Sequence, residues 1–558
     1  MSLVTNSAVR PLHRRAMESR FWRSAFLALL VLECSPFLVN RYFPSQDGPS
    51  HLHNASVLAH YGSELIYRQY YSIAPLQVSG NMLTQLILAT LLKFTEPLLA
   101  ERLLLIGYVI LLFMSVRYLL NALTPYADYF SLFAGILVSN YFLYMGFWNF
   151  SYSVCLMLFT LGYYVRRQHR WELRSLTVLA FGGLIVYLAH SVSWVVCVVA
   201  VAILGLPQPI SAIRRRRARP QVVSVRSAIL QYALPLSSLL PPAFFALIYL
   251  ARSQGRMAGA AVDEPSWGER LWPLYSLSFL HTIAGSDLIL AKAVASILFI
   301  AFLTAVGGVL WRRQYDWRGT SVLVLSLVFA VIAVVAPDAV GSGAYIHGRV
   351  ALYAWLFLVV WLALQSWPRW ALNIFAALFC GTAVIGLAVR VPVLSRWNED
   401  LSSFAAVGRN IRPGSTVLRL SLGSLAKGVD PYKHAAGILP SRAIINLSNY
   451  EASTDYFSTR FRPERCPFPA LGTLAELGAA PPVFDIVRYE RETQGRVDYI
   501  LFQGGADSER NGMDPLEVTL YGDQIAGYTL VSSGQRGNVR LYQRNSTGPN
   551  GGAGASKN

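Results

Sequence analysis

Apolar residues gather in long runs separated by short polar stretches, and this pattern defines the class of the protein. A helix that crosses about 30 Å of hydrocarbon needs about 20 residues, because each residue rises about 1.5 Å. The pattern therefore predicts a mainly α, polytopic membrane protein with about 11 transmembrane helices in a domain spanning residues 1–390. The predicted spans lie at about 21–39, 102–120, 129–146, 149–165, 174–190, 192–207, 228–250, 287–310, 320–336, 350–366 and 371–389.

The composition and the distribution of charge agree with this class. The chain is 54% hydrophobic and 14% charged, with a mean hydropathy of +0.41, which is too apolar for an ordinary soluble protein. Its net charge of +18 comes from arginines in short clusters between the apolar runs, such as Arg214 to Arg217. Such clusters mark cytoplasmic loops rather than a nucleic-acid surface. We therefore expect a multi-pass protein of the inner (plasma) membrane, with a cytoplasmic N-terminus and no nucleic-acid partner.

The same orientation makes three outer loops long. The run at 81–94 is short for a crossing, and counting it as a span would invert every later segment, so it predicts a helix on the membrane surface. The first outer loop then covers about 40–100 and holds a further interfacial helix from Pro49 to about Tyr61. The second covers about 251–287 and includes the amphipathic stretch WGERLWPLYSLSFLH. The third, at 336–349, is rich in glycine.

Beyond residue 390 the sequence becomes mixed and globular. Residues 391–545 are long enough to bury a core, and span parity makes them an extracytoplasmic (periplasmic) α/β domain. Alternating apolar residues predict strands at 415–422 and 497–503, and a terminal hairpin formed by YTLVSS and NVRLYQR. Residues 546–558 have the composition of a disordered tail. The segment 446–463 is dense in polar and aromatic groups, as a carbohydrate-binding surface or an ordinary loop would be.

The stretch FPSQDGPSHL places a carboxylate, Asp47, just beyond the first span. Because Pro49 favours the start of a helix, Asp47 is in a position to cap the free N–H groups there. A carboxylate with His51 and His53 within one turn also has the makings of a general base or of a metal ligand. The two interpretations are compatible, since a capped carboxylate is a positioned one.

Other ionisable residues near the outer side also have two interpretations. Glu33 lies inside the first span, where a carboxyl group is either functional or bonded to a neighbouring helix. His190 ends a span and either hydrogen-bonds to backbone or supports a site. Arg102 and Arg349 begin spans, where arginine either snorkels to headgroups or binds a phosphate. His347 lies beside Arg349 and favours function there.

The order of these features resembles the glycosyltransferase-C superfamily, which includes protein O-mannosyltransferases and lipid A aminoarabinose transferases. The resemblance rests on Asp47 in QDGPSHLHNA and on TEPLLAERLLL, where Arg102 begins the second span. It implies an inverting transfer of a sugar from a polyprenyl-phosphate donor to an extracytoplasmic glycan, lipid or protein. The resemblance maps Asp47, which would be the base, and Arg102. The chemistry of the residues adds His51 beside the base and Arg349, with Arg102, as the group that holds the donor phosphate.

The sequence departs from that superfamily in its acids. No second acid follows Asp47 or lies near Asn149, so no acidic pair supports a divalent metal, and the cofactor is unknown. His51, Glu33 or His190 would supply what the second acid does elsewhere. No Walker A, GxSxG, HExxH or CxxC motif is present, so other chemistries have no visible support.

Two functions of other classes stay open. In a transporter or flippase, Glu33 and Asp47 would be coupling groups within the membrane domain. In a non-catalytic subunit of an envelope polysaccharide assembly system, Asp47 would be only a helix cap.

Overall fold

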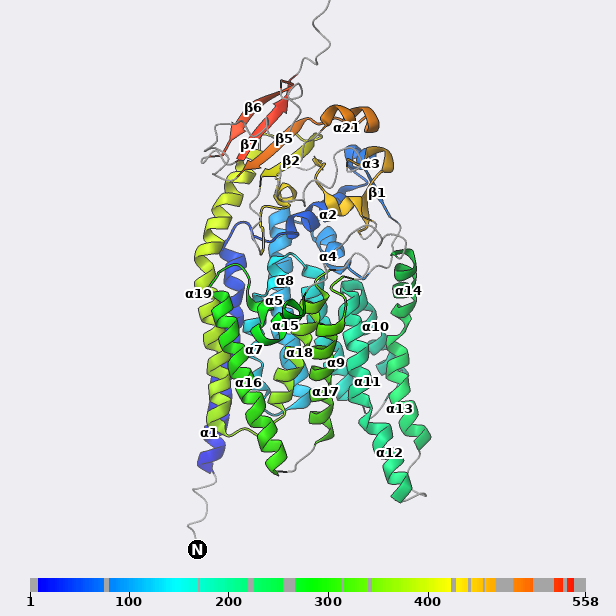
Figure 1. The fold of residues 1–558 in the computed structure, drawn as a ribbon, viewed down its shortest axis with the longest axis vertical. Coiled ribbons are helices and arrows are strands. Elements are labelled where there is room, and N and C mark those ends of the chain that lie inside the picture. The colour runs from blue at the N-terminus through cyan, green and yellow to red at the C-terminus, as the bar shows by residue number, and fades with distance from the viewer. Residues whose placement is uncertain are drawn as a thin grey trace, which may run out of the picture.

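The computed structural model is a long helical bundle that carries a small mixed sheet at one end (Figure 1). The predicted tail at 546–558 lies outside the described residues, as do parts of the second and third outer loops. The structure describes residues 9–74, 80–168, 171–218, 225–253, 266–312, 316–339, 344–422, 428–439, 443–454, 457–467, 485–504, 526–534 and 539–545.

The bundle consists of long apolar helices whose buried faces form one continuous core. Among the described residues, seven helices are long and apolar enough to cross a membrane, or eight if the bent pair α13 and α14 is one span. The long helices are α1 (Val9–Val39), α5 (Pro97–Leu123), α9 (Trp148–Arg167), α10 (Leu173–Ala189), α11 (Ser191–Gly205), α12 (Pro207–Ala218), α13 (Val225–Leu239), α14 (Pro241–Ser253), α16 (Asp287–Arg312), α17 (Trp317–Val335), α18 (Ile346–Ala363) and α19 (Arg369–Gly408).

Each predicted span is helical, but the segment predicted at 228–250 is the bent pair α13 and α14, and the segment predicted at 129–146 is not one helix. It forms three short helices, α6 (Ala127–Phe130), α7 (Phe133–Val138) and α8 (Tyr141–Tyr144). The chain breaks at Asn140, whose side chain accepts a hydrogen bond from the Leu143 amide and starts α8 anew. Helix α10, with 17 residues, is also shorter than a typical span. The structure therefore confirms a membrane protein with several candidate spans, and the count of eleven stays a prediction.

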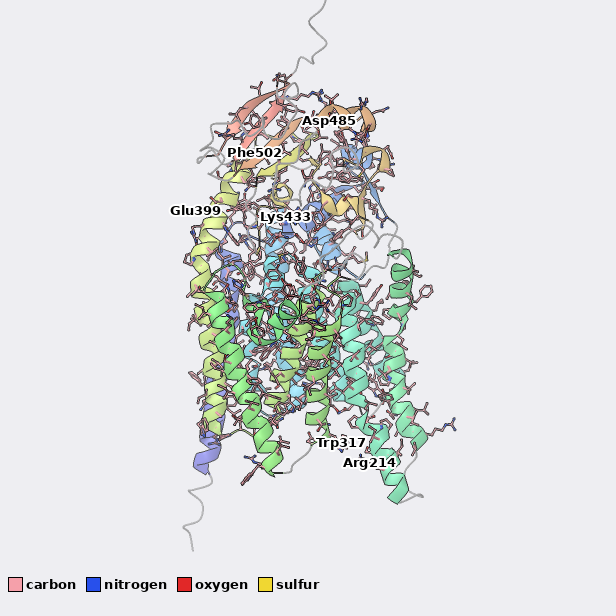
Figure 2. The ribbon with its side chains drawn as sticks, in the orientation of Figure 1. Arg214, Trp317, Glu399, Lys433, Asp485 and Phe502 are labelled. Atoms are coloured by element: carbon pink, nitrogen blue, oxygen red, sulfur yellow. The ribbon has the colours of Figure 1, made fainter. Side chains whose placement is uncertain are left out.

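Helix α19 is much longer than a span requires. Its 40 residues extend about 60 Å, roughly twice the thickness of the hydrocarbon. It therefore continues beyond the bundle and ends beneath the sheet (Figure 1). The Arg214 guanidinium, 5.3 Å from the Trp317 ring, lies at the opposite end of the molecule from Lys433 (Figure 2).

Short helices also form in the outer loops. They are α2 (Gly48–His60), α3 (Leu65–Tyr70), α4 (Leu83–Leu91) and α15 (Trp267–Ser276), and strand β1 (Tyr71–Ile73) follows α3 directly. Helices α2 and α4 lie between the bundle and the sheet, α3 lies beside the sheet, and α15 packs against α16, α17 and α18 within the bundle (Figure 1). Helices α2, α4 and α15 confirm the helices predicted at 49–61, at 81–94 and in WGERLWPLYSLSFLH.

The sheet has five strands in the order β3-β2-β5-β7-β6. Strand β2 is parallel to β3 and β5, whereas β7 is antiparallel to β5 and β6. The predicted strands and the terminal hairpin are confirmed. The elements are β2 (Thr416–Leu422), the 3-10 helix η3 (Ala435–Ile438), β3 (Ile445–Asn446), the 3-10 helix η4 (Tyr450–Ser453), β4 (Thr459–Phe461), the 3-10 helix η5 (Pro463–Arg465), α21 (Ile486–Thr493), β5 (Tyr499–Gly504), β6 (Tyr528–Ser533) and β7 (Val539–Arg544).

The C-terminal region is built onto the first outer loop rather than standing apart from it. Strand β1 of the loop pairs antiparallel with β4, with Tyr71 opposite Phe461. Tyr71 is buried in one cluster with Leu418 and Ile500 of the sheet. On the other side, a β-carbon on Gly437 would lie 1.8 Å from the Pro49 carbonyl oxygen, so η3 packs directly on the start of α2. The first outer loop and the C-terminal region thus share one folded layer around α2.

Candidate functional site

The backbone at Asp47 is held in place by the turn between α8 and α9. The Gln46 amide donates to the Tyr144 carbonyl at 2.9 Å, and the Asp47 amide donates to the Met145 carbonyl at 3.1 Å. Gly146 follows with φ +84°, a conformation that glycine adopts without strain. Asp47 occupies the N-cap position of α2, but its side chain accepts no capping hydrogen bond. The capping interpretation is therefore wrong for the carboxylate, which is directed elsewhere.

The Asp47 carboxylate instead faces groups from a distant part of the chain. It is 8% exposed, and its Oδ1 accepts a hydrogen bond from Gln46 Nε2 at 3.3 Å. His434 Nε2 lies 3.6 Å from the same oxygen, and the His434 ring stacks on Tyr450 with 4.5 Å between centroids. Gln46 Oε1 accepts from the Asp430 amide at 3.2 Å, which anchors the segment carrying His434. The C-terminal region thus supplies one wall of the site.

A second group from the C-terminal region meets His51. Glu451 is fully buried, and its Oε1 lies 2.8 Å from His51 Nδ1. Its Oε2 accepts a hydrogen bond from Asn54 Nδ2 at 2.6 Å, and Asn54 Oδ1 accepts from Asn449 Nδ2 at 2.7 Å. The ring of Trp148 lies against His51, with centroids 5.9 Å apart. The site therefore does contain a second acid, supplied by η4.

Burial and neighbouring charges set the ionisation of these groups. Burial raises the pKa of Asp47 from 3.8 to about 6, opposed chiefly by the charge of His51. Burial acts to lower the pKa of His51, but Glu451 and Asp47 outweigh it, so the pKa of His51 is raised. Burial, aided by Lys433, holds the pKa of His434 well below its usual range. The Asp47 carboxylate is therefore flanked by His434, whose imidazole is neutral, and by His51, whose protonated form its acidic neighbours favour.

His53 does not join this site. Its Nε2 lies 3.3 Å from the hydroxyl of Tyr71, and the two rings meet edge to face. Burial lowers the pKa of His53 to about 4, so the imidazole is neutral near pH 7. His53 thus packs against β1, on the same side as the junction with β4.

Arg349 and His190, predicted separately, lie together. Arg349 Nη1 is 3.0 Å from His190 Nε2, and its guanidinium lies 4.7 Å from the ring centroid of Phe147 and 5.3 Å from that of Phe150. The His190 Nδ1 accepts from the Val192 amide at 3.3 Å and so caps α11. The arginine is 6% exposed, which is unlike a side chain that snorkels to lipid headgroups.

Two tyrosines lie near Asp47, and one of them also lies near Arg349. Tyr345 precedes α18 in a left-handed conformation with φ +60°, and its ring lies 6.1 Å from that of Tyr141. The charges of Asp47 and Arg349 both act on the Tyr345 phenol, and the charge of Asp47 also acts on Tyr141. The Asp47 carboxylate and the Arg349 guanidinium therefore share one phenol, that of Tyr345, as a neighbour.

His347 holds the start of α18, next to Arg349, in place. Its Nδ1 donates to the Ala333 carbonyl at 2.6 Å, and its backbone amide donates to Asp338 Oδ1 at 3.3 Å. Both bonds tie the start of α18 to the end of α17. His347 therefore fixes the position of Arg349 rather than facing Asp47.

The last two predicted residues lie elsewhere. Glu33 is 2% exposed in α1 and has Arg390 of α19 as its charged neighbour, and Arg390 Nε is paired with Asp287 Oδ1 at 3.1 Å. Arg102 is partly buried, and its Nη2 donates to the Asn40 carbonyl at 3.4 Å, which ties α5 to the end of α1. Both have contacts that stabilise the bundle.

A groove of about 730 Å³ opens next to the segment that carries His434. One wall is the turn before α16, with Ile283 and Ala284, and the other is α19, with Val393, Arg396 and Trp397. Tyr432, two residues before His434, also lines the groove and donates to Asp400 Oδ2 at 2.7 Å. Two residues span at most about 7 Å, and His434 lies 3.6 Å from Asp47, so the Tyr432 side of the groove is close to Asp47.

Sequence reasoning missed Glu451 and His434, which complete the site. The polar and aromatic density of 446–463 was the available signal for Glu451, and nothing in the sequence singled out His434. Within the described part of the chain, no group of three or more His, Cys, Asp or Glu could hold a metal ion. No protein-family model matches the sequence, and no curated protein matches it either.

Proposed function

We propose that this protein transfers a sugar from a polyprenyl-phosphate donor to a hydroxyl group of an extracytoplasmic acceptor, with Asp47 as the general base. The proposal includes the orientation expected from the charge pattern, with the sheet and the site outside the plasma membrane. The acceptor would be a glycan, a lipid or a protein.

One observation carries the proposal: Asp47 is a buried carboxylate that caps nothing and has two histidines and a second acid around it. A carboxylate needed only for folding would be satisfied by the helix whose start it occupies. A pKa near 6 suits a base that accepts a proton near neutral pH, because it is ionised yet basic enough to act.

The reaction needs few groups. The acceptor hydroxyl would attack the anomeric carbon and pass its proton to the Asp47 carboxylate, while the bond from that carbon to the phosphate oxygen breaks. The lipid phosphate would leave with the bonding electrons and needs cations more than an acid. Arg349 suits this role, since its planar guanidinium matches phosphate oxygens and, like Asp47, it has the Tyr345 phenol as a neighbour.

The groove beside α19 suits the lipid part of the donor. Apolar side chains such as Val393 and Ile283 would contact a prenyl chain, and Arg396 would meet its phosphate on the way in. Tyr432 joins this groove to the segment of His434. A donor lying there would approach Asp47 from the membrane lipid without passing through the C-terminal region.

The test is donor consumption by the purified full-length protein. Wild type and Asp47→Asn would be incubated in membrane lipid with a panel of polyprenyl-phosphate sugars and extracted acceptors, and free polyprenyl phosphate would be measured by mass spectrometry. We expect wild type to release the lipid phosphate from one donor class and Asp47→Asn to lose at least a hundredfold in rate. Asp485→Asn is the matched control, because Asp485 is an N-cap whose carboxylate does accept a helix amide, from Arg488 at 2.9 Å.

Equal rates for wild type and Asp47→Asn would sink the assignment of the base. Consumption of no donor by wild type would favour a transporter or an assembly subunit instead. The buried acids of the bundle give a transporter little support. The Glu33, Asp287 and Arg390 group lies about 30 Å along α19 from its Arg369 end, near the outer boundary rather than at mid-membrane.

A further inference from the structure

Glu451 is a carboxylate with no access to solvent, in a segment that only the complete fold brings to α2. Its two oxygens meet His51 Nδ1 at 2.8 Å and Asn54 Nδ2 at 2.6 Å. Burying a carboxylate without a cationic partner costs several kcal/mol, so a contact of this kind is retained for packing or for chemistry. His51 itself lies one turn after Asp47, and its amide donates to the Asp47 carbonyl at 3.1 Å.

We propose that Glu451 is a positioning residue for the base: it fixes the His51 imidazole and keeps it protonated beside the Asp47 carboxylate. This inference rests on the proposed function and deepens it. The second acid that the sequence lacks near Asp47 comes from the C-terminal region and acts through a histidine rather than on a metal.

The charged groups around Asp47 agree with a chain in which Glu451 acts on His51 and His51 acts on Asp47. Asp47 faces His51, Glu451 and Lys433, with the neutral His434 at 3.6 Å and two tyrosines nearby. Among these charges, His51 has the largest effect that lowers the pKa of Asp47, and Glu451 has a smaller effect that raises it.

The neighbours of His51 are Glu451, Asp47 and His434. If Glu451 becomes neutral, the pKa of His51 falls because its main stabilising charge is lost. Asp47 then loses the positive charge of His51, which lowers its pKa, together with the negative charge of Glu451, which raises its pKa by less. The pKa of Asp47 therefore rises.

Glu451→Gln separates charge from shape, because glutamine keeps an oxygen that can accept from Asn54. The first readout is the protonation of His51 in the purified full-length protein, followed by deuterium exchange at the imidazole C2 position and mass spectrometry of the peptide. His53 in the same peptide titrates at about pH 4, below the range of interest. We expect the His51 midpoint to move to lower pH in Glu451→Gln and to stay near that of wild type in Glu451→Asp.

Glu464→Gln is the matched control, since the Glu464 side chain in the same region is 64% exposed and should leave the midpoint unchanged. The second readout is the pH dependence of donor consumption. We expect its acid limb to move to higher pH in Glu451→Gln, and the rate on that limb to fall about tenfold for every pH unit that the limb moves.

An unchanged His51 midpoint in Glu451→Gln overturns the inference, whatever happens to activity. A uniform loss of rate at every pH also overturns it, because that is the signature of a purely structural residue. Failure of wild type to consume any donor overturns the proposed function, while the His51 midpoint still decides whether Glu451 keeps this histidine protonated.

Discussion

Gly146 and Asp47 are in backbone contact so close that a β-carbon on Gly146 would lie 2.8 Å from the Asp47 amide nitrogen and 2.4 Å from that of Gly48. With φ +84° at Gly146, alanine there would be strained as well as crowded. We expect Gly146→Ala to lower the free energy of unfolding by about 1 to 3 kcal/mol and to reduce transfer by displacing Asp47. Thermal unfolding checks this. Gly62→Ala has open space and should unfold like wild type.

Gly437 controls the docking of the C-terminal region on α2. Since a β-carbon there would meet the Pro49 carbonyl, Gly437→Ala should move η3 away and with it the segment of His434. We expect loss of transfer and faster proteolysis after residue 408, with the bundle left intact. Limited proteolysis followed by mass spectrometry measures this. Gly268→Ala, whose nearest neighbour is Ser266 Oγ at 3.9 Å, is the control, and equal cleavage of the two variants would contradict the prediction.

The buried Asp47 carboxylate should cost stability. Its pKa is higher in the fold than in the unfolded chain, so its favourable contribution is present below about pH 4 and is lost as the pH rises through 6. Asp47→Asn should therefore raise the free energy of unfolding at pH 7.5 by roughly 1 to 3 kcal/mol and give no gain near pH 4. Thermal unfolding at both values tests this. A destabilised Asp47→Asn at pH 7.5 would argue that the carboxylate is structural.

Substitutions of Arg349 and Arg102 should differ in effect, although the sequence predicts that both arginines hold the donor phosphate. Arg349 lies with His190 near the tyrosines of the site, whereas Arg102 donates to the Asn40 carbonyl. We expect Arg349→Gln to lower kcat/KM for the donor about a hundredfold, or roughly 3 kcal/mol, and Arg102→Gln to lower it less than tenfold. Steady-state kinetics decides. The reverse order would move the phosphate site to the start of α5.

Filling the groove should weaken donor binding without altering the chemistry. Val393 lines the wall of α19, so Val393→Trp occupies part of the 730 Å³. We expect a higher KM for the lipid donor with an unchanged kcat, because only binding common to substrate and transition state is lost. Val384→Trp, at a position on α19 that is 45% exposed and outside the groove, should behave like wild type. An unaltered KM in Val393→Trp would place the donor elsewhere.

Local patterns in the sequence predicted the elements well and the site only in part. The helix after Asp47 and the strands such as 415–422 follow from residues that are neighbours in the chain, where periodicity and turn chemistry act directly. Glu451 reaches His51 only because β4 pairs with β1 and η3 packs on α2, and no periodic pattern encodes contacts between segments so far apart. His53 shows the converse limit, since its distance from Asp47 in sequence matched that of a site residue while the helix turned it towards Tyr71.

The pairing of the first outer loop with the C-terminal region sets when the site can form. Asn54 and Glu451 are 397 residues apart, and a ribosome adds about 5 to 20 residues per second. Glu451 is therefore synthesised roughly 20 to 80 s after Asn54 of α2. Until then β1 has an open edge, and Asp47 lacks both His434 and Glu451. A chain that stops between the end of α19 and η4 lacks Glu451, so it holds the helices of the bundle but not the complete set of groups around Asp47.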